Sequence, residues 1–271
     1  MTGLAKEIVL VSGGRSHLCA AFLTNHHTDL HTANSGIGFE LARQLLSKGT
    51  YHVLLGARSP QRGTDALKDL QSRNLPGSIE FLHLDLSDDS TIANATTRIA
   101  ASHGHLDILI NNAAIASFTQ ADRAAFRSSF DTNATGPYLL SKSLISLLKK
   151  SPNPRIINVS SGAGSIGRRL TPESPMYKIQ AEPYRASKVA MNMLTTCLHV
   201  EYGLNYGEGG KGVKVFAYDP GFTVSNLSEA NKKENGARSA EDSVRSLMDV
   251  VEGKRDGEVG RFIHNTGEYP W

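Results

Sequence analysis

The sequence has little of what marks secreted, membrane-spanning or nucleic-acid-binding proteins. Its two cysteines, Cys19 and Cys197, give no disulfide framework and predict a reducing compartment. No apolar run reaches the ~18 residues of a membrane span, and the N-terminus lacks the basic-then-apolar pattern of a signal peptide. Basic residues are scattered, although the formal net charge is +3. We therefore expect a cytoplasmic protein that binds neither membranes nor nucleic acid.

The composition is that of an ordinary folded domain. Of the 271 residues, 39% are hydrophobic and 20% are charged, which argues against disorder. This length suits one α/β domain with a substantial core. Because the chain shows no internal repeat and no clear linker, we expect a single domain over residues 1–271.

Short apolar runs alternate with segments of helical periodicity along the chain. The runs predict strands at 8–11, 52–55, 79–84, 108–110, 155–159 and 213–218. Helices are predicted at 39–47, 64–73, 90–100, 131–150, 184–202 and 240–252. Strands that are apolar throughout are typical of a parallel sheet covered on both faces. We expect a doubly wound Rossmann α/β domain with a mostly parallel sheet of about seven strands, whose ligands bind at the carboxyl ends of the strands.

A glycine-rich turn follows the first predicted strand, but it is interrupted. Its first half comes directly after the strand and its second half opens the next helix. Glycines let the backbone approach a pyrophosphate, and a helix N-terminus supplies N–H donors. A purely structural glycine turn is the alternative. The residues expected to bind a dinucleotide here are Ser12, Gly13, Ser35, Gly36, Ile37 and Gly38.

The ends of the next strands indicate which dinucleotide is bound. No carboxylate follows the second strand to bind the ribose 2′-hydroxyl of NAD; Arg58 stands there and can pair with a 2′-phosphate, which favours NADP(H). After the third strand, Asp85 is placed to accept a hydrogen bond from the adenine amino group, or to cap the helix that starts near Ser87. After the fourth strand, Asn112 lies in a small, amide-rich segment suited to packing against the cofactor.

Tyr184 and Lys188 place a phenol and an ammonium on one face of a helix that starts at Pro183. Such a pair arises easily by chance, so its position after a strand ending in Asn158-Val159-Ser160-Ser161 gives it weight. The ordered set of glycine turn, Asn111-Asn112-Ala113-Ala114, Asn133, Ser161, Tyr184-x-x-x-Lys188 and Asp219-Pro220-Gly221 resembles the short-chain dehydrogenase/reductases over nearly the whole chain. The segment Gly56-Ala57-Arg58 is similar to that of NADPH-dependent carbonyl reductases.

This resemblance implies four catalytic roles. Tyr184 would donate a proton to the carbonyl oxygen, or accept one in reverse. Lys188 would favour the phenolate and bind the nicotinamide ribose hydroxyls. Ser161 would hydrogen-bond the carbonyl oxygen. Asn133 would hold a water that relays protons to Lys188, the alternative being an amide engaged in a local hydrogen bond.

The resemblance also implies contacts from the later part of the chain. Pro220, Gly221 and Thr223 would pack against the nicotinamide, with a plain Pro–Gly turn as the alternative. The substrate pocket would be lined by the loops 114–118, 161–184 and 222–236. The second of these is longer than is common in the family, and the oligomeric state stays open. The only tryptophan, Trp271, could close that pocket or lie on the surface.

The implied function is that of an NADP(H)-dependent oxidoreductase that interconverts a ketone or aldehyde and an alcohol by hydride transfer. Its partner would be a small-molecule carbonyl or alcohol substrate. The alternative is a catalytically impaired NADP-binding or regulatory protein, because the cofactor loop is broken. Neither the substrate nor the physiological direction can be derived from the sequence.

An insert at about residues 15–33 separates the two halves of the glycine turn, and family members have nothing there. His26, His27, Asp29 and His31 raise the question of a metal site, but no second ligand cluster is evident, so a polar loop is favoured and no metal is expected. We hypothesise that the segment is a short intron read in frame. Loop closure costs little more for longer loops, so the sheet can form around it. The halves of the phosphate cradle would no longer be directly joined, and we expect weaker NADPH binding as a result.

Overall fold

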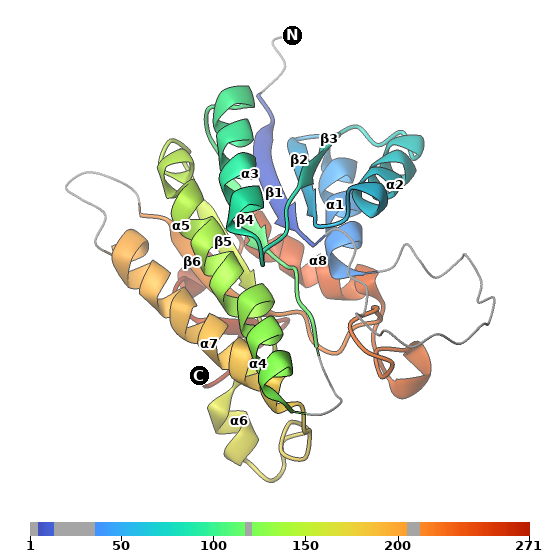
Figure 1. Ribbon diagram of the computed structural model, residues 1–271, viewed down its shortest axis with the longest axis vertical. Coiled ribbons are helices and arrows are strands. Elements are labelled where there is room, and N and C mark those ends of the chain that lie inside the picture. Colours follow the sequence, from blue (N-terminus) through green and yellow to red (C-terminus); the bar gives the residue numbers. More distant parts are fainter. Residues whose placement is uncertain (1–4, 14–35, 117–120, 205–211) are drawn as a thin grey trace.

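The computed structural model describes residues 5–13, 36–116, 121–204 and 212–271. Within them, eight strands form one sheet in the order β3-β2-β1-β4-β5-β6-β7-β8 (Figure 1). All neighbours are parallel except β7 and β8. The strands are β1 (Glu7–Ser12), β2 (Tyr51–Ala57), β3 (Ser78–His83), β4 (Ile108–Asn111), β5 (Arg155–Val159), β6 (Lys214–Asp219), β7 (Phe262–His264) and β8 (Gly267–Glu268).

Helices cover both faces of this sheet. In Figure 1, α3, α5 and α7 lie in front of it. One face carries α1 (Ile37–Lys48), α2 (Pro60–Ser72) and α8 (Ala240–Val251), and the other carries α3 (Asp89–Ser102), α5 (Gly136–Leu148) and α7 (Glu182–Leu198). Two shorter helices, α4 (Arg123–Phe130) and α6 (Ile166–Leu170), lie near the carboxyl ends of the strands. The doubly wound Rossmann α/β fold is thereby confirmed.

Successive side chains along each strand point alternately into two separate hydrophobic cores. Val9 and Val11 of β1 point into the core beneath α1 and α8, whereas Leu10 points into the core beneath α3 and α5. Successive strand side chains point to opposite faces, and here both faces are covered. This is why the strands read as unbroken apolar runs in the sequence.

Polar side chains fix where the helices begin. The Oδ1 of Asp88 accepts from the N–H of Ser90 (2.9 Å) at the start of α3, and the Oγ of Ser239 accepts from the N–H of Asp242 (3.0 Å) at the start of α8. In contrast, the N-cap of α1 is Gly36, which has no side chain that could cap the helix.

The sequence prediction differs from the structure mainly in detail. All six predicted strands are present, and β7 and β8 extend the sheet past the last of them. The predicted helix 131–150 is a π-helical turn (Asp131–Thr135) followed by α5, preceded by the unpredicted α4. Within the described residues no helix is long and apolar enough to cross a membrane. The insert at about residues 15–33, to which the intron hypothesis applies, lies outside the described residues.

Candidate active site

A cavity of about 780 Å³ opens at the carboxyl ends of the strands. It extends from the β1–α1 turn, at Gly13 and Gly36, to the start of α7, at Tyr184. The strand order reverses between β1 and β4, and the cavity lies at this reversal. Open α/β sheets bind their ligands at such a point.

The two halves of the glycine turn meet at one end of this cavity. Gly13 has a φ of +77°, and a Cβ placed on it would lie 2.6 Å from the Cα of Ala113. A Cβ on Gly38 would lie 2.6 Å from the carbonyl oxygen of Gly13. A side chain is therefore excluded at Gly13 and at Gly38, on both sides of the turn. Ser35 lies outside the described residues.

This bare turn fits the phosphates of a dinucleotide. Gly36, Ile37 and Gly38 line the cavity at the uncapped start of α1, where the N–H groups and the helix dipole favour an anion. Asn112 holds the other side of the turn, since its Nδ2 donates to the carbonyl oxygens of Ser12 (3.1 Å) and Gly13 (3.2 Å). The amide of Asn112 thus supports the cradle from behind.

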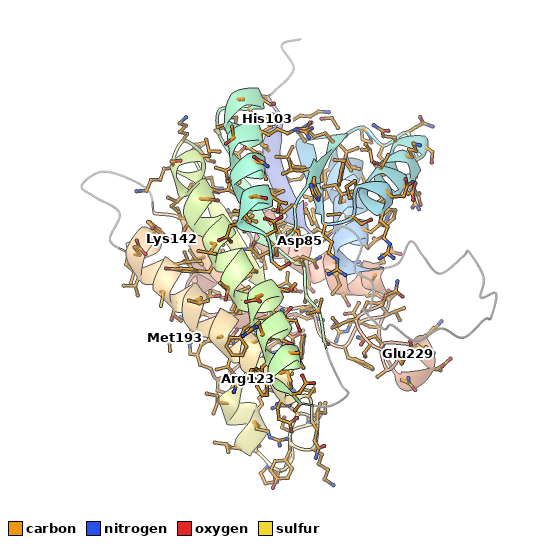
Figure 2. The ribbon with its side chains drawn as sticks, viewed as in Figure 1. Asp85, His103, Arg123, Lys142, Met193 and Glu229 are labelled. Atoms are coloured by element: carbon orange, nitrogen blue, oxygen red, sulfur yellow. The ribbon has the colours of Figure 1, made fainter. Side chains whose placement is uncertain are left out.

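Arg58 and Asp85 line a second, smaller pocket that adjoins the cradle at Gly13. Asp85 follows β3, and Figure 2 labels it near the end of that strand. Its Oδ1 accepts from the N–H (2.9 Å) and hydroxyl (2.7 Å) of Ser87. The alternative that Asp85 caps the following helix is wrong, because Asp88 caps α3.

Arg62 is a further arginine that the sequence motifs did not indicate. It lies in the first turn of α2, one helical turn beyond Arg58, and it lines the cavity beside Phe39. The signal was present in the sequence as a second arginine four residues after Arg58. Without the cavity, however, nothing distinguished it from a solvated helix residue.

Tyr184 and Ser161 lie beside each other at the other end of the cavity. Ser161 comes directly after β5, and Tyr184 lies in the first turn of α7. Burial raises the pKa of Tyr184 to about 12, although the neighbouring Ser161 hydroxyl acts in the opposite direction. Near neutral pH this phenol is protonated and can act as a proton donor.

Lys188 is 1% exposed and lies one turn after Tyr184. Its Nζ donates to the carbonyl oxygen of Val159 (2.8 Å) and lies 5.8 Å from the centre of the Tyr184 ring. Burial lowers the pKa of Lys188 to about 8, and the charge of Asp219 opposes that change. The raised pKa of Tyr184 comes mainly from burial, and the expectation that Lys188 favours the phenolate stays a prediction.

Asn133 is fully buried in the π-helical turn between α4 and α5. Its Oδ1 accepts from the N–H of Ile115 (2.8 Å), and its Nδ2 donates to the Ile115 carbonyl oxygen (2.8 Å) and to the Oγ of Ser187 (3.0 Å). Both donors of the amide are therefore used within the protein. None of these partners is local in the sequence: the side chain ties the loop after β4 to α7, and its role in holding a water stays a prediction.

Pro220, Gly221 and Thr223 follow β6 and line the cavity. The Oγ1 of Thr223 is buried and bonded to the carbonyl oxygen of Gly221 (2.9 Å) and to the Oγ of Ser243 (2.7 Å). Gly221 has a φ of +79°, which makes a sharp turn next to Arg238. This loop forms one wall of the cavity.

The three loops expected around the substrate all reach the cavity. Ala114, Met176 and Leu227 each come from a different one of them. Trp271 is 40% exposed and stacks on Phe262, so it lies on the surface rather than in the cavity.

One histidine–carboxylate group lies far from the cavity, at the amino ends of β2 and β3. Glu80 accepts hydrogen bonds there from His103 (2.7 Å) and Arg98 (2.9 Å), with His52 beside it at 3.6 Å. This group has the composition of an ion-pair network and is separate from the cavity.

The sheet order, the glycine turn at the start of α1, the half-buried Ser161 and the buried Tyr184 and Lys188 are features of a nicotinamide-dinucleotide-dependent oxidoreductase of the Rossmann type. The family model for short chain dehydrogenases matches residues 30–236. The chain belongs to the short-chain dehydrogenase/reductase family, whose members are enzymes that use NAD(P)(H).

Fungal relatives resemble the chain over its full length. The short-chain dehydrogenase/reductase tropE of Talaromyces stipitatus is 32% identical, with 97% of each chain covered. The short-chain dehydrogenase anuI of Penicillium roqueforti is also 32% identical, with 100% of each chain covered. Among solved structures, an NADPH-bound carbonyl reductase from chicken fatty liver superposes with a TM-score of 0.78 at 26% identity, covering 99% of this chain and all of the other.

Proposed function

We propose that this protein is an NADP(H)-dependent oxidoreductase that interconverts a ketone or aldehyde and an alcohol. The observation that carries the proposal is that Ser161, Tyr184 and the buried Lys188 line one end of a cavity whose other end begins at the glycine turn. Reduction of a carbonyl needs a hydride source, a proton donor and a group that stabilises the developing oxyanion. Bound NADPH would supply the hydride.

The side chains of this chain would supply the rest. Tyr184, protonated near neutral pH, would give its proton to the carbonyl oxygen as negative charge develops there. Ser161 would donate a hydrogen bond to the same oxygen. Lys188, whose pKa is lowered to about 8, would be charged at neutral pH and would stabilise the phenolate that is left. Asn133 would keep the loop after β4 and the helix α7 in register.

The preference for NADP(H) rests on two arginines. Arg58 and Arg62 lie at the end of β2 and in the first turn of α2, next to the cradle, and the end of β2 offers no carboxylate to a ribose 2′-hydroxyl. Two guanidinium groups suit a 2′-phosphate. The NADPH bound to the chicken carbonyl reductase supports the same choice. We further propose a small-molecule carbonyl substrate and a cytoplasmic location, the latter from the cysteine usage.

The test is the loss of NADPH absorbance with a panel of aldehydes and ketones. Tyr184→Phe should lower the rate by about 10²–10⁴-fold, because it removes the proton donor. Tyr177→Phe is the matched control: Tyr177 lies in the loop before α7, is 41% exposed and should tolerate the change. Absence of any NADPH oxidation by the unaltered chain, with NADPH still bound, would favour the catalytically impaired alternative.

A further inference from the structure

Asp219, the last residue of β6, connects the two loops that flank the catalytic side chains. It is 6% exposed. Its Oδ2 accepts from the N–H of Gly162 (2.9 Å), directly after Ser161. Its Oδ1 accepts from the N–H of Gly221 (2.8 Å), two residues before Thr223. One carboxylate thus fixes the loop of Ser161 and the loop that walls the cavity relative to each other.

The C-terminal segment holds this carboxylate from the other side. The Arg168 guanidinium lies 4.1 Å from the centre of the Tyr269 ring, and Asp219 and Arg168 both lie close enough to Tyr269 to shift the pKa of its phenol. The C-terminal segment, residues 269–271, packs against α6 and the residues before it. There the Oγ of Ser165 donates to the carbonyl oxygen of Pro270 at 2.6 Å. Asp219 is therefore covered by residues far from it in the sequence.

The same carboxylate acts electrostatically on both proton-handling groups. Its negative charge raises the pKa of Lys188, against the larger effect of burial, and also raises the pKa of Tyr184. Burial raises the pKa of Asp219 itself, whereas its hydrogen bonds and the charges of Arg168 and His264 lower it. The titratable and charged groups that surround the carboxylate are Tyr184 and Lys188 of α7, Arg168 of α6, Tyr218 of β6, His264 of β7, Arg238 before α8, and Tyr269.

We propose that Asp219 is a positioning residue of the active site, which ties the Ser161 loop to the Gly221 loop, brings a negative charge to the cavity that Lys188 also lines, and is itself covered by Tyr269 of the C-terminal segment. Only a carboxylate of this size can accept an N–H on each of its two oxygens; an amide would place NH₂ against one donor. Its electrostatic half rests on the proposed function, since it concerns the protonation of Tyr184 and Lys188 during turnover.

The structural half is tested without activity, by amide hydrogen exchange in Asp219→Asn and Tyr269→Phe. Exchange at Gly162 or Gly221, whichever N–H faces the NH₂ of the new amide, should become at least about tenfold faster in Asp219→Asn, since one lost bond of about 1.4 kcal/mol corresponds to that factor. A smaller change of the same kind is expected in Tyr269→Phe. Asp107→Asn is the matched control: it changes another buried carboxylate, which accepts from the N–H of Ile8 (2.7 Å) at the opposite ends of the strands. Unchanged exchange at both glycines in both active-site variants would overturn this half.

The electrostatic half is tested by the pH profile of kcat for carbonyl reduction. Removing the charge of Asp219 lowers the pKa of both Lys188 and Tyr184, so in Asp219→Asn the alkaline limb should move down by about 0.5–1 pH unit, whichever group governs it. In Tyr269→Phe and in Asp107→Asn the limb should stay in place. A lower kcat with an unmoved limb in Asp219→Asn would overturn the electrostatic role. If the unaltered chain oxidises no NADPH, the proposed function fails, and the exchange experiment still decides the positioning role.

Discussion

Replacement of Arg58 by alanine should weaken NADPH binding selectively. Each hydrogen bond to a charged group contributes about 1.5–3 kcal/mol, but Arg58 is exposed and water competes for the phosphate. A loss of about 1–2 kcal/mol corresponds to a rise in Kd of about 5–30-fold. The Kd of NADH, which carries no 2′-phosphate, should stay within about twofold.

Fluorescence titration of both dinucleotides measures this difference. Arg62→Ala should show the same selectivity, and the double variant should approach equal affinity for NADPH and NADH. Arg73→Ala is the control, because Arg73 is an exposed arginine at the other end of α2, paired with Asp69. If Arg58→Ala and Arg62→Ala weaken both dinucleotides equally, or neither, the assignment of the 2′-phosphate site is incorrect.

Three further predictions concern other parts of the chain. Lys188→Met should abolish carbonyl reduction, yet it should raise the free energy of unfolding near neutral pH by on the order of 1–2 kcal/mol, because the buried ammonium is charged below its pKa of about 8. Chemical denaturation at a series of pH values measures this gain. The gain should shrink as the pH rises from about 8 towards the ordinary lysine pKa of 10.5. Gly63→Ala should destabilise the fold by about 1–3 kcal/mol, because its Cβ would lie 2.1 Å from the ring of Phe81; Gly257→Ala, which meets nothing within 4 Å, should leave the melting temperature unchanged. A chain lacking residues 15–33 should bind NADPH more tightly than the chain described here, and equal Kd values would contradict this.

The fold could be predicted from the sequence because both faces of the sheet are covered. Strands β1 to β6 are apolar runs, and the helices between them show clear periodicity, so these elements were predicted near their observed positions. Strands β7 and β8 span three and two residues, which is too short for a periodic signal. The π-helical turn before α5 was not predicted, because its five residues continue directly into α5 and the segment has the sequence pattern of one helix.

The candidate site was predictable in its residue types but not in its electrostatics. Tyr184 and Lys188 could be named from their spacing, yet the raised pKa of one and the lowered pKa of the other follow from burial, which depends on distant segments. The side chain of Asn133 makes hydrogen bonds to Ile115 and Ser187, which are far from it in the sequence. In the sequence, Asp219 stands only in the Asp219-Pro220-Gly221 segment that resembles the family. Its contacts to Gly162 and Tyr269 join residues that no local pattern connects.

The packing of the C-terminal segment places a fluorescent side chain, Trp271, against β7. Trp271 is the only tryptophan in the chain, and it stacks on Phe262 with ring centres 5.7 Å apart. Its emission maximum and quenching by iodide therefore report on one place alone. A red-shifted, readily quenched emission would mean that the C-terminal segment has moved away from Phe262. Stopped-flow recording of that emission can follow the segment during each catalytic turnover.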